Sequence, residues 1–279
     1  MREKENFLLP SAIKPEVVVT DIAFAEGPAA ADDGYIYFVN YKRLGTIGRY
    51  FPGGSPEVWA ETGGQANGLK YDPRGFIVVA DFGGQRITRF SLKTRKMEII
   101  TSEYEGSPYL GPNDLCLDPH GDIVFTDPTG SSIDNPIGSI YKIKTAKDGL
   151  AQKVIRLDNK LAFPNGLAFH PDGSKLYLAE SGTNRLLSYS VDEEGLLSDK
   201  KIVMQFPTDT LDGISFDQFS NLWIARWTNG TIDVVDISSG SLIKSYKLGE
   251  RVTNMCWLNG YLYVTIAGNG TIVRIPVWQ

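Results

Sequence analysis

One short pattern occurs six times along the chain, and this repeat limits what the chain can fold into more than any other feature. In the fourth copy, Asn165-Gly166 opens a first apolar stretch, Pro171-Asp172-Gly173 forms a turn, and a second stretch ends at Glu180. The six copies begin at residues 26, 67, 113, 165, 212 and 254, which lie 41 to 52 residues apart. A period of ~40–50 residues built from short strands is typical of propeller blades.

The length of each copy leaves room for two further strands, for example over residues 85–92 and 96–101 in the second copy. The last copy has only a third strand, over residues 271–277, before the chain ends. Residues 15–20 can supply its missing outer strand, which would close the ring and cover two strand edges. We therefore predict an all-β, six-bladed β-propeller with four-stranded blades, a single domain over residues 1–279, and an N-terminal arm at 1–14. An open, three-stranded last blade is the alternative.

Composition narrows the classes of protein that remain. The net charge of −5 and the pI near 5.2 argue against a nucleic-acid-binding surface. The sequence contains neither an apolar run of about 18 residues nor an apolar secretory segment near Met1, so we expect a cytoplasmic protein that does not enter a membrane. Cys116 and Cys256 fall in the third and sixth copies, on opposite sides of the ring, too far apart for a disulfide. No oligomeric state is predicted.

Propeller topology places polar side chains at one mouth of the central channel. The first strand of a blade lies innermost, so the six residues that open the copies should ring this mouth. The second strands return to the same face and should form a wider ring with their last residues, Asn40, Asp81, Asp127, Glu180 and Arg226. Carboxylate and amide oxygens of this kind suit Ca²⁺ or Mg²⁺.

Glu26 is the most informative member of the inner ring, because glutamate does not favour turns. A carboxylate in a crowded channel costs several kcal/mol unless a positive charge meets it. Glu26 and Asp212 would neutralise a divalent cation, while Asn113 and Asn165 would add carbonyl oxygens. The competing interpretation is that Asn-Gly and Asp-Gly are ordinary strand-opening and turn dipeptides. We favour that interpretation for the inner-ring members Asn67 and Asn254.

Four motifs in this order resemble the SMP-30/gluconolactonase/luciferin-regenerating family, and the resemblance runs from about residue 16 to the end. They are Glu26-Gly27-Pro28, Asn113-Asp114, the stretch 164–169 and Leu211-Asp212-Gly213; the stretch 125–128 is similar to the bacterial gluconolactonase branch. The resemblance implies a six-bladed propeller with a divalent metal in the channel, commonly calcium, and a lactonase or a related phosphotriesterase. By motif, the family's metal ligands match Glu26, Asn113, Asn165 and Asp212, and Asp212 also matches its base or nucleophile.

We therefore predict a metal-dependent lactonase that hydrolyses a small-molecule lactone. One divalent cation is expected, with Ca²⁺ favoured over Mg²⁺, Mn²⁺ or Zn²⁺. Asp212 would act as base, and substrate would be bound by Asn113, Arg226, Asp127 and Glu180. Residues 102–112 and 127–139 are expected to wall the substrate pocket. The alternatives are a phosphotriesterase or other esterase at the same site, and a binding propeller without catalysis.

Overall fold

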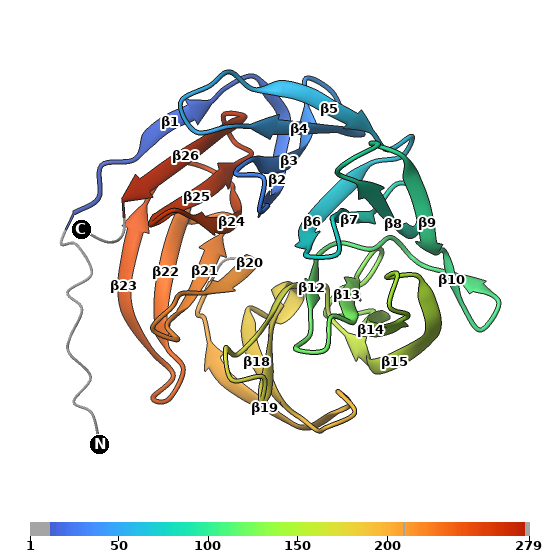
Figure 1. The fold of residues 1–279 in the computed structure, drawn as a ribbon. Helices are drawn as coiled ribbons and strands as arrows, with labels where there is room; N and C mark the ends of the chain where they lie inside the picture. The colour runs from blue at the N-terminus through green and yellow to red at the C-terminus, as the bar shows by residue number, and fades with distance from the viewer. Residues whose placement is uncertain (1–11, 209, 277–279) are drawn as a thin grey trace.

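The blades of the propeller are antiparallel sheets arranged in a ring around a central channel (Figure 1). The computed structural model describes residues 12–208 and 210–276, and this part of the chain forms six four-stranded sheets and one two-stranded hairpin. The predicted all-β, six-bladed fold is confirmed. Within the described residues the helical structure is limited to one 3-10 turn, η1 (Ser181–Thr183).

The blades follow one another along the chain, and the strands of each blade are ordered from the channel outward. Blade 1 contains β2 (Ile22–Ala30), β3 (Ile36–Tyr41), β4 (Thr46–Tyr50) and β5 (Glu57–Glu61). Blade 2 contains β6 (Ala66–Asp72), β7 (Phe76–Asp81), β8 (Arg86–Ser91) and β9 (Met97–Thr101). Blade 3 contains β12 (Leu115–Leu117), β13 (Ile123–Asp127), β14 (Gly138–Thr145) and β15 (Ala151–Leu161).

The second half of the ring repeats this order. Blade 4 contains β16 (Pro164–Phe169), β17 (Lys175–Glu180), β18 (Arg185–Val191) and β19 (Leu197–Gln205). Blade 5 contains β20 (Leu211–Phe216), β21 (Leu222–Arg226), β22 (Thr231–Asp236) and β23 (Ser241–Lys247). Blade 6 contains β24 (Val252–Leu258), β25 (Tyr261–Ile266), β26 (Thr271–Pro276) and β1 (Glu16–Val19). The hairpin of β10 (Glu103–Tyr104) and β11 (Ser107–Pro108) projects at the outer rim (Figure 1).

The N-terminal strand closes the ring, as the sequence predicts. β1 pairs antiparallel with β26, with Glu16 opposite Arg274 and Val17 opposite Val273. The Arg274 Nε also donates a hydrogen bond of 2.7 Å to the Glu16 carboxylate. The strand covers the outer edge of the last blade, which would otherwise offer unpaired backbone groups. Most of the predicted arm at 1–14 lies outside the described residues.

The hydrophobic core lies between neighbouring blades, because each sheet buries side chains on both faces. Tyr37 and Val39 of blade 1, for example, pack with Ile77 and Val79 of blade 2. Cys116 in β12 and Cys256 in β24 are free thiols, and burial raises the pKa of Cys256 to about 12. No helix in the described part of the chain has the length and apolar character needed to cross a bilayer.

Candidate metal centre at the hub

In four of the six copies the innermost strand loses its regular pairing around the polar residue that opens the copy. In β2 the register shifts on both sides of Glu26, and in β16 it shifts between Pro164 and Leu167, around Asn165. The same irregularity surrounds Asp212 in β20 and Asn67 in β6. A bulge of this kind bends the strand and redirects a side chain. These local defects turn the polar side chains of the repeat toward the channel.

Glycine follows each of these four residues because atoms of the next blade, from its backbone or from a side chain such as that of Asn254, lie very close at the hub. A Cβ atom on Gly27 would lie 2.2 Å from the carbonyl oxygen of Asn67, and one on Gly166 would lie 2.4 Å from that of Asp212. Such distances leave no room for a side chain. The Asn-Gly and Asp-Gly dipeptides therefore lie at the start of irregularly paired strands and do not form turns. Only the turn part of the competing interpretation is corrected.

Five of the six inner-ring residues line one cavity of about 260 Å³. Among them, the four residues predicted as metal ligands are each no more than 9% exposed. The described lining consists of Phe24, Glu26, Asn67, Asn113, Phe163, Asn165, Thr210, Asp212 and Trp227. Asn67, for which the sequence favoured a purely structural role, lies on this lining, and its Nδ2 donates to the Asn113 carbonyl at 3.3 Å. The sixth residue, Asn254, donates instead to Asp114 at 3.1 Å.

Sequence reasoning missed four lining residues, although three of them follow a simple rule. Phe24, Phe163 and Thr210 each precede an inner-ring residue by two positions. This common spacing could have identified them. Strand alternation could not, because Phe163 and Thr210 precede β16 and β20, and the pairing of β2 is irregular between Ile22 and Glu26. Trp227, in contrast, follows the end of β21 and carries no such signal.

The carboxyl group of Glu26 lies in a strongly unfavourable setting for a negative charge. Burial, and after it the carboxylate of Asp212, raises the pKa of Glu26 well above its ordinary value of 4.5. The Gly27 amide offsets part of this cost by donating a hydrogen bond of 2.7 Å to Oε2. The described lining contains no Lys, Arg or His side chain that would add a positive charge. A bound cation would relieve this cost.

Asn113 gives an independent indication that the cavity is built to bind a ligand. Its Oδ1 atom is buried and has no hydrogen-bond partner, a state that native proteins rarely tolerate. Together with Asn165, Glu26 and Asp212 it offers two carboxylate and two amide oxygens, the hard donors that Ca²⁺ and Mg²⁺ prefer. The described residues contain no group of three or more His, Cys, Asp or Glu arranged for a metal, so this is a mixed acid–amide set. These residues could hold one divalent cation of the calcium type.

The outer-ring side chains make a different kind of contact. Asp127 accepts hydrogen bonds from the amides of Leu110 (2.9 Å) and Gly111 (2.7 Å), in the segment that leads into its own blade. Glu180 and Asp81 make the same contact in their blades, with the amides of Ala162 (3.0 Å) and Gln65 (2.8 Å) respectively. The outer ring thus fastens the lead-in segments of the inner strands.

Arg226 makes the equivalent contact in blade 5, but as a hydrogen-bond donor to a backbone carbonyl rather than as an acceptor. Its Nη2 donates to the carbonyl of Thr208 at 2.7 Å, and its Nη1 donates to Asp233 at 2.8 Å in a buried ion pair. Neither Arg226 nor Asp127 nor Glu180 belongs to the described lining of the hub cavity. Of the four predicted substrate-binding residues, only Asn113 is on that lining, and a substrate contact by the other three stays a prediction.

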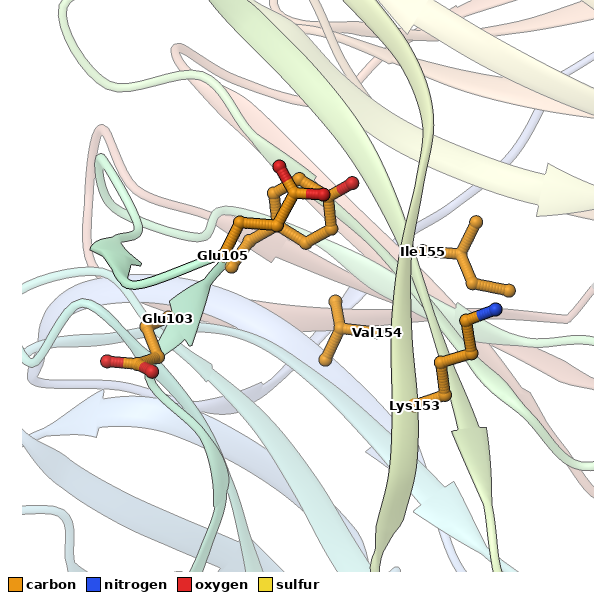
Figure 2. A pocket seen from close by; sticks show the side chains of 6 residues that line it. Glu103, Glu105, Lys153, Val154 and Ile155 are labelled. Atoms are coloured by element: carbon orange, nitrogen blue, oxygen red, sulfur yellow. The ribbon is translucent and has the colours of Figure 1, made fainter.

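The two segments expected to wall the pocket lie elsewhere. Part of residues 102–112 forms the β10–β11 hairpin, which faces β15 across a surface groove of about 450 Å³ at the rim of the propeller. Figure 2 shows Glu103 and Glu105 on the hairpin side of this groove and Lys153 to Ile155 on the strand side. In residues 127–139, Ser131 donates to the Leu161 carbonyl, which ties that segment to the lead-in of blade 4. The described lining of the hub cavity takes no residue from either segment, so the expected wall is not supported.

A six-bladed propeller with a buried acid–amide pocket at its hub defines the structural class of this protein. The family described as SMP-30/gluconolactonase/LRE-like region matches residues 24–268, and the chain therefore belongs to this family. The resemblance drawn from the sequence motifs is confirmed.

Two relatives and one solved structure illustrate the relationship. A gluconolactonase of Zymomonas mobilis is 25% identical over 289 residues, covering 93% of this chain and 80% of that protein. The diisopropyl-fluorophosphatase of Loligo vulgaris is 30% identical over 255 residues, covering 80% and 78%. The structure of a gluconolactonase from Xanthomonas campestris superposes with a TM-score of 0.83 at 22% identity, covering 97% of this chain and 91% of that one. This last likeness concerns the fold.

Proposed function

We propose that the protein is a divalent-metal-dependent lactonase that opens the ester bond of a lactone ring with water. The observation that carries this proposal is the buried, unpartnered Oδ1 of Asn113 in the same cavity as the carboxyl groups of Glu26 and Asp212. Similarity to the Zymomonas gluconolactonase over most of the chain supports the lactone as substrate.

Glu26, Asn113, Asn165 and Asp212 would hold the ion, and their oxygen donors favour Ca²⁺ over Mg²⁺, Mn²⁺ or Zn²⁺. When bound, the ion supplies Lewis-acid stabilisation of the oxyanion that develops on the carbonyl and lowers the pKa of water. The protein's own contribution to the chemistry centres on Asp212. Its carboxylate accepts a proton from the attacking water while the water oxygen bonds to the carbonyl carbon. The ring C–O bond then breaks, and the proton passes to the leaving alkoxide. Direct attack by Asp212 on the carbonyl is the alternative within the same site.

A phosphotriesterase is the second candidate. The squid diisopropyl-fluorophosphatase is 30% identical over 80% of this chain, which favours this candidate over other esterases. Hydrolysis of a phosphotriester would use the same acid–amide pocket. A binding propeller without catalysis would need none of the four polar residues for its function.

The test is a substrate panel containing sugar lactones, aromatic lactones and a phosphotriester, each assayed with calcium and with EDTA. We expect lactone hydrolysis that EDTA abolishes and that added calcium restores. Preference for the phosphotriester would favour the second candidate. Hydrolysis unaffected by EDTA, or no hydrolysis of any substrate, would overturn the proposed function.

A further inference from the structure

Resting on the proposed function, we infer that the hub cavity selects uncharged ring esters with an apolar or aromatic substituent, rather than polyhydroxylated sugar lactones. Phe24, Phe163 and Trp227 would form the surface against which this substituent packs. They come from three blades: Phe24 lies in β2, Phe163 precedes β16, and Trp227 follows β21.

The division of the lining into four potential metal ligands and five other residues supports this selectivity. The five others are the three aromatic residues together with Asn67 and Thr210. All three aromatic side chains are only partly buried, whereas the carboxyl and amide groups of the ligand set are buried. The rings of Phe24 and Trp227 lie 6.0 Å apart at an angle of 39° and make one continuous apolar wall. A substrate whose carbonyl reaches the buried polar groups would therefore place its substituent against aromatic faces.

The backbone conformation of Phe163 also indicates a functional role for this residue of the cavity lining. Its φ of +50° is in the left-handed region, which bulky residues rarely adopt and which costs on the order of 1–3 kcal/mol. Two hydrogen bonds hold it there: its amide donates to Ser131 Oγ at 3.2 Å, and its carbonyl accepts from the Ser181 amide at 3.0 Å. Strain retained on a cavity wall is typical of functional positions. A role in packing against substrate accounts for an aromatic residue at a position that glycine would occupy without strain.

The charge of the cavity disfavours acidic substrates. The described lining contains no Lys, Arg or His, and two carboxylates with one divalent ion would leave it neutral. Two arginines lie near the cavity without lining it: Arg226 pairs with Asp233, and the Arg251 guanidinium lies 5.8 Å from the centre of the Trp227 ring. A carboxylate or phosphate group on the substrate would therefore find no basic side chain on the described lining.

The supply of polar partners disfavours sugars. Buried hydroxyl groups must be hydrogen-bonded, and an unsatisfied one costs about 1–3 kcal/mol. Outside the ligand set only Asn67 and Thr210 offer polar side chains on the described lining, and Asn67 already donates to the Asn113 carbonyl. The volume of about 260 Å³ also lies just below the range of about 300–1,000 Å³ that is usual for drug-sized ligands. A single or fused ring is therefore the expected size of substrate.

The experiment compares three lactones by kcat/KM in the presence of calcium, each divided by the rate constant of its own uncatalysed hydrolysis. This division is needed because the phenolic leaving group of dihydrocoumarin makes its ester more reactive than that of an alkyl lactone. The three lactones are dihydrocoumarin (aromatic), δ-valerolactone (a bare ring) and glucono-δ-lactone (polyhydroxylated). We expect dihydrocoumarin to be at least tenfold better than the bare ring, and glucono-δ-lactone to be no better than it. Trp227→Ala and Phe24→Ala should each lower kcat/KM at least tenfold for dihydrocoumarin and less than threefold for δ-valerolactone.

Controls separate loss of packing from loss of fold. Trp227→Phe should keep most of the preference for dihydrocoumarin over δ-valerolactone. Phe219→Ala removes an aromatic residue that is 39% exposed, and it should leave kcat/KM unchanged for all three lactones. Thermal melting and calcium titration should show that every variant is folded and binds the ion as the wild type does. Preference for glucono-δ-lactone, or an unchanged dihydrocoumarin to valerolactone ratio in folded Trp227→Ala and Phe24→Ala, would overturn this inference and leave the proposed lactonase standing.

Binding of a compound that cannot be cleaved distinguishes failure of the proposed lactonase function from failure of the inference about the apolar cavity. 2-Tetralone has the fused ring of dihydrocoumarin and a carbonyl at the same ring position, but a CH2 group replaces the ester oxygen. If the wild type hydrolyses no lactone and yet binds 2-tetralone in a way that Trp227→Ala weakens at least tenfold, the proposed function fails and the apolar cavity stands. If Trp227→Ala leaves the affinity for 2-tetralone unchanged, the inference about the cavity fails.

Discussion

Two rings of polar side chains lie at the same mouth of this propeller, and their polar atoms have very different surroundings. In the outer ring, Asp127 and Glu180 accept hydrogen bonds from backbone amides, and Arg226 donates one to a backbone carbonyl. In the inner ring, Asn113 keeps a buried oxygen without a partner, and Glu26 is buried beside the carboxyl group of Asp212. Similar residue types thus support the fold where backbone groups supply their hydrogen bonds. Where backbone groups do not, the side chains are candidate metal ligands. Matched substitutions in the two rings test this distinction.

The largest expected effect is on catalysis by the inner ring. Asp212→Asn should lower kcat for lactone hydrolysis by about 10²–10⁴, because an amide cannot accept the proton of the attacking water. Asp127→Asn, the same change in the outer ring, should alter kcat less than about threefold. Steady-state kinetics on the two variants measure the difference. Comparable losses in both, or full activity in Asp212→Asn, would remove the distinction between the rings.

The second largest effect is a loss of stability when an outer-ring residue is replaced. Asp127→Ala should lower the free energy of unfolding by about 2–4 kcal/mol, because the amides of Leu110 and Gly111 lose a buried acceptor. Urea denaturation in the presence of EDTA measures this loss without a contribution from bound metal. Calcium affinity of the folded variant should stay within about twofold of the wild type. A variant that is as stable as the wild type but binds calcium poorly would reverse the roles that we assign.

The outer ring should also contribute to the pH dependence of stability. Burial raises the pKa of Asp127 above its ordinary value of 3.8, although the Leu110 and Gly111 amides lower it in part. The folded protein therefore binds this proton more tightly than the unfolded chain does, and stability falls as pH rises from 3.8 through the raised value. Urea denaturation across this interval should show a shallower fall for Asp127→Asn than for the wild type. Equal slopes would mean that this carboxyl group does not titrate as its burial suggests.

The smallest effect is expected at Asn113. Asn113→Leu replaces a buried oxygen that lacks a partner by an apolar group of similar size, so the metal-free protein should be as stable as the wild type or up to about 1 kcal/mol more stable. The same variant should bind calcium at least tenfold more weakly. Denaturation in EDTA and calcium titration measure the two quantities. A clear loss of stability would show that Asn113 serves the scaffold and belongs with the outer ring.

The sequence was sufficient to predict the fold because the repeat is local and regular. The spacing of Asn165, Asp212 and the other opening residues identified the blades, and the unmatched strand near Glu16 identified the closure of the ring. The inner ring followed from topology, since first strands lie innermost. The role of Gly27 and its equivalents could not be predicted from the sequence, because the need for glycine arises from atoms of a neighbouring blade.

The features that the sequence did not reveal are contacts between distant segments. Asp127 and Glu180 end strands at the predicted mouth, but the amides that they bind belong to lead-in segments whose course no local pattern reveals. The hairpin at 103–108 lies at the outer rim, and no local pattern in the sequence reveals this direction either. Phe24 and Phe163 share a spacing of two residues from an inner-ring residue, whereas the place of Trp227 depends on the path of the chain after β21.

Isothermal titration with calcium shows whether the inner ring holds the metal. The wild type, Glu26→Gln and Asp127→Asn are compared under the same conditions. We expect one strongly bound ion in the wild type and in Asp127→Asn, and at least 100-fold weaker binding in Glu26→Gln, because only the inner-ring change removes a charged ligand from the hub. Unchanged calcium affinity in Glu26→Gln, or its loss in folded Asp127→Asn, would contradict the assignment of the metal centre to the inner ring.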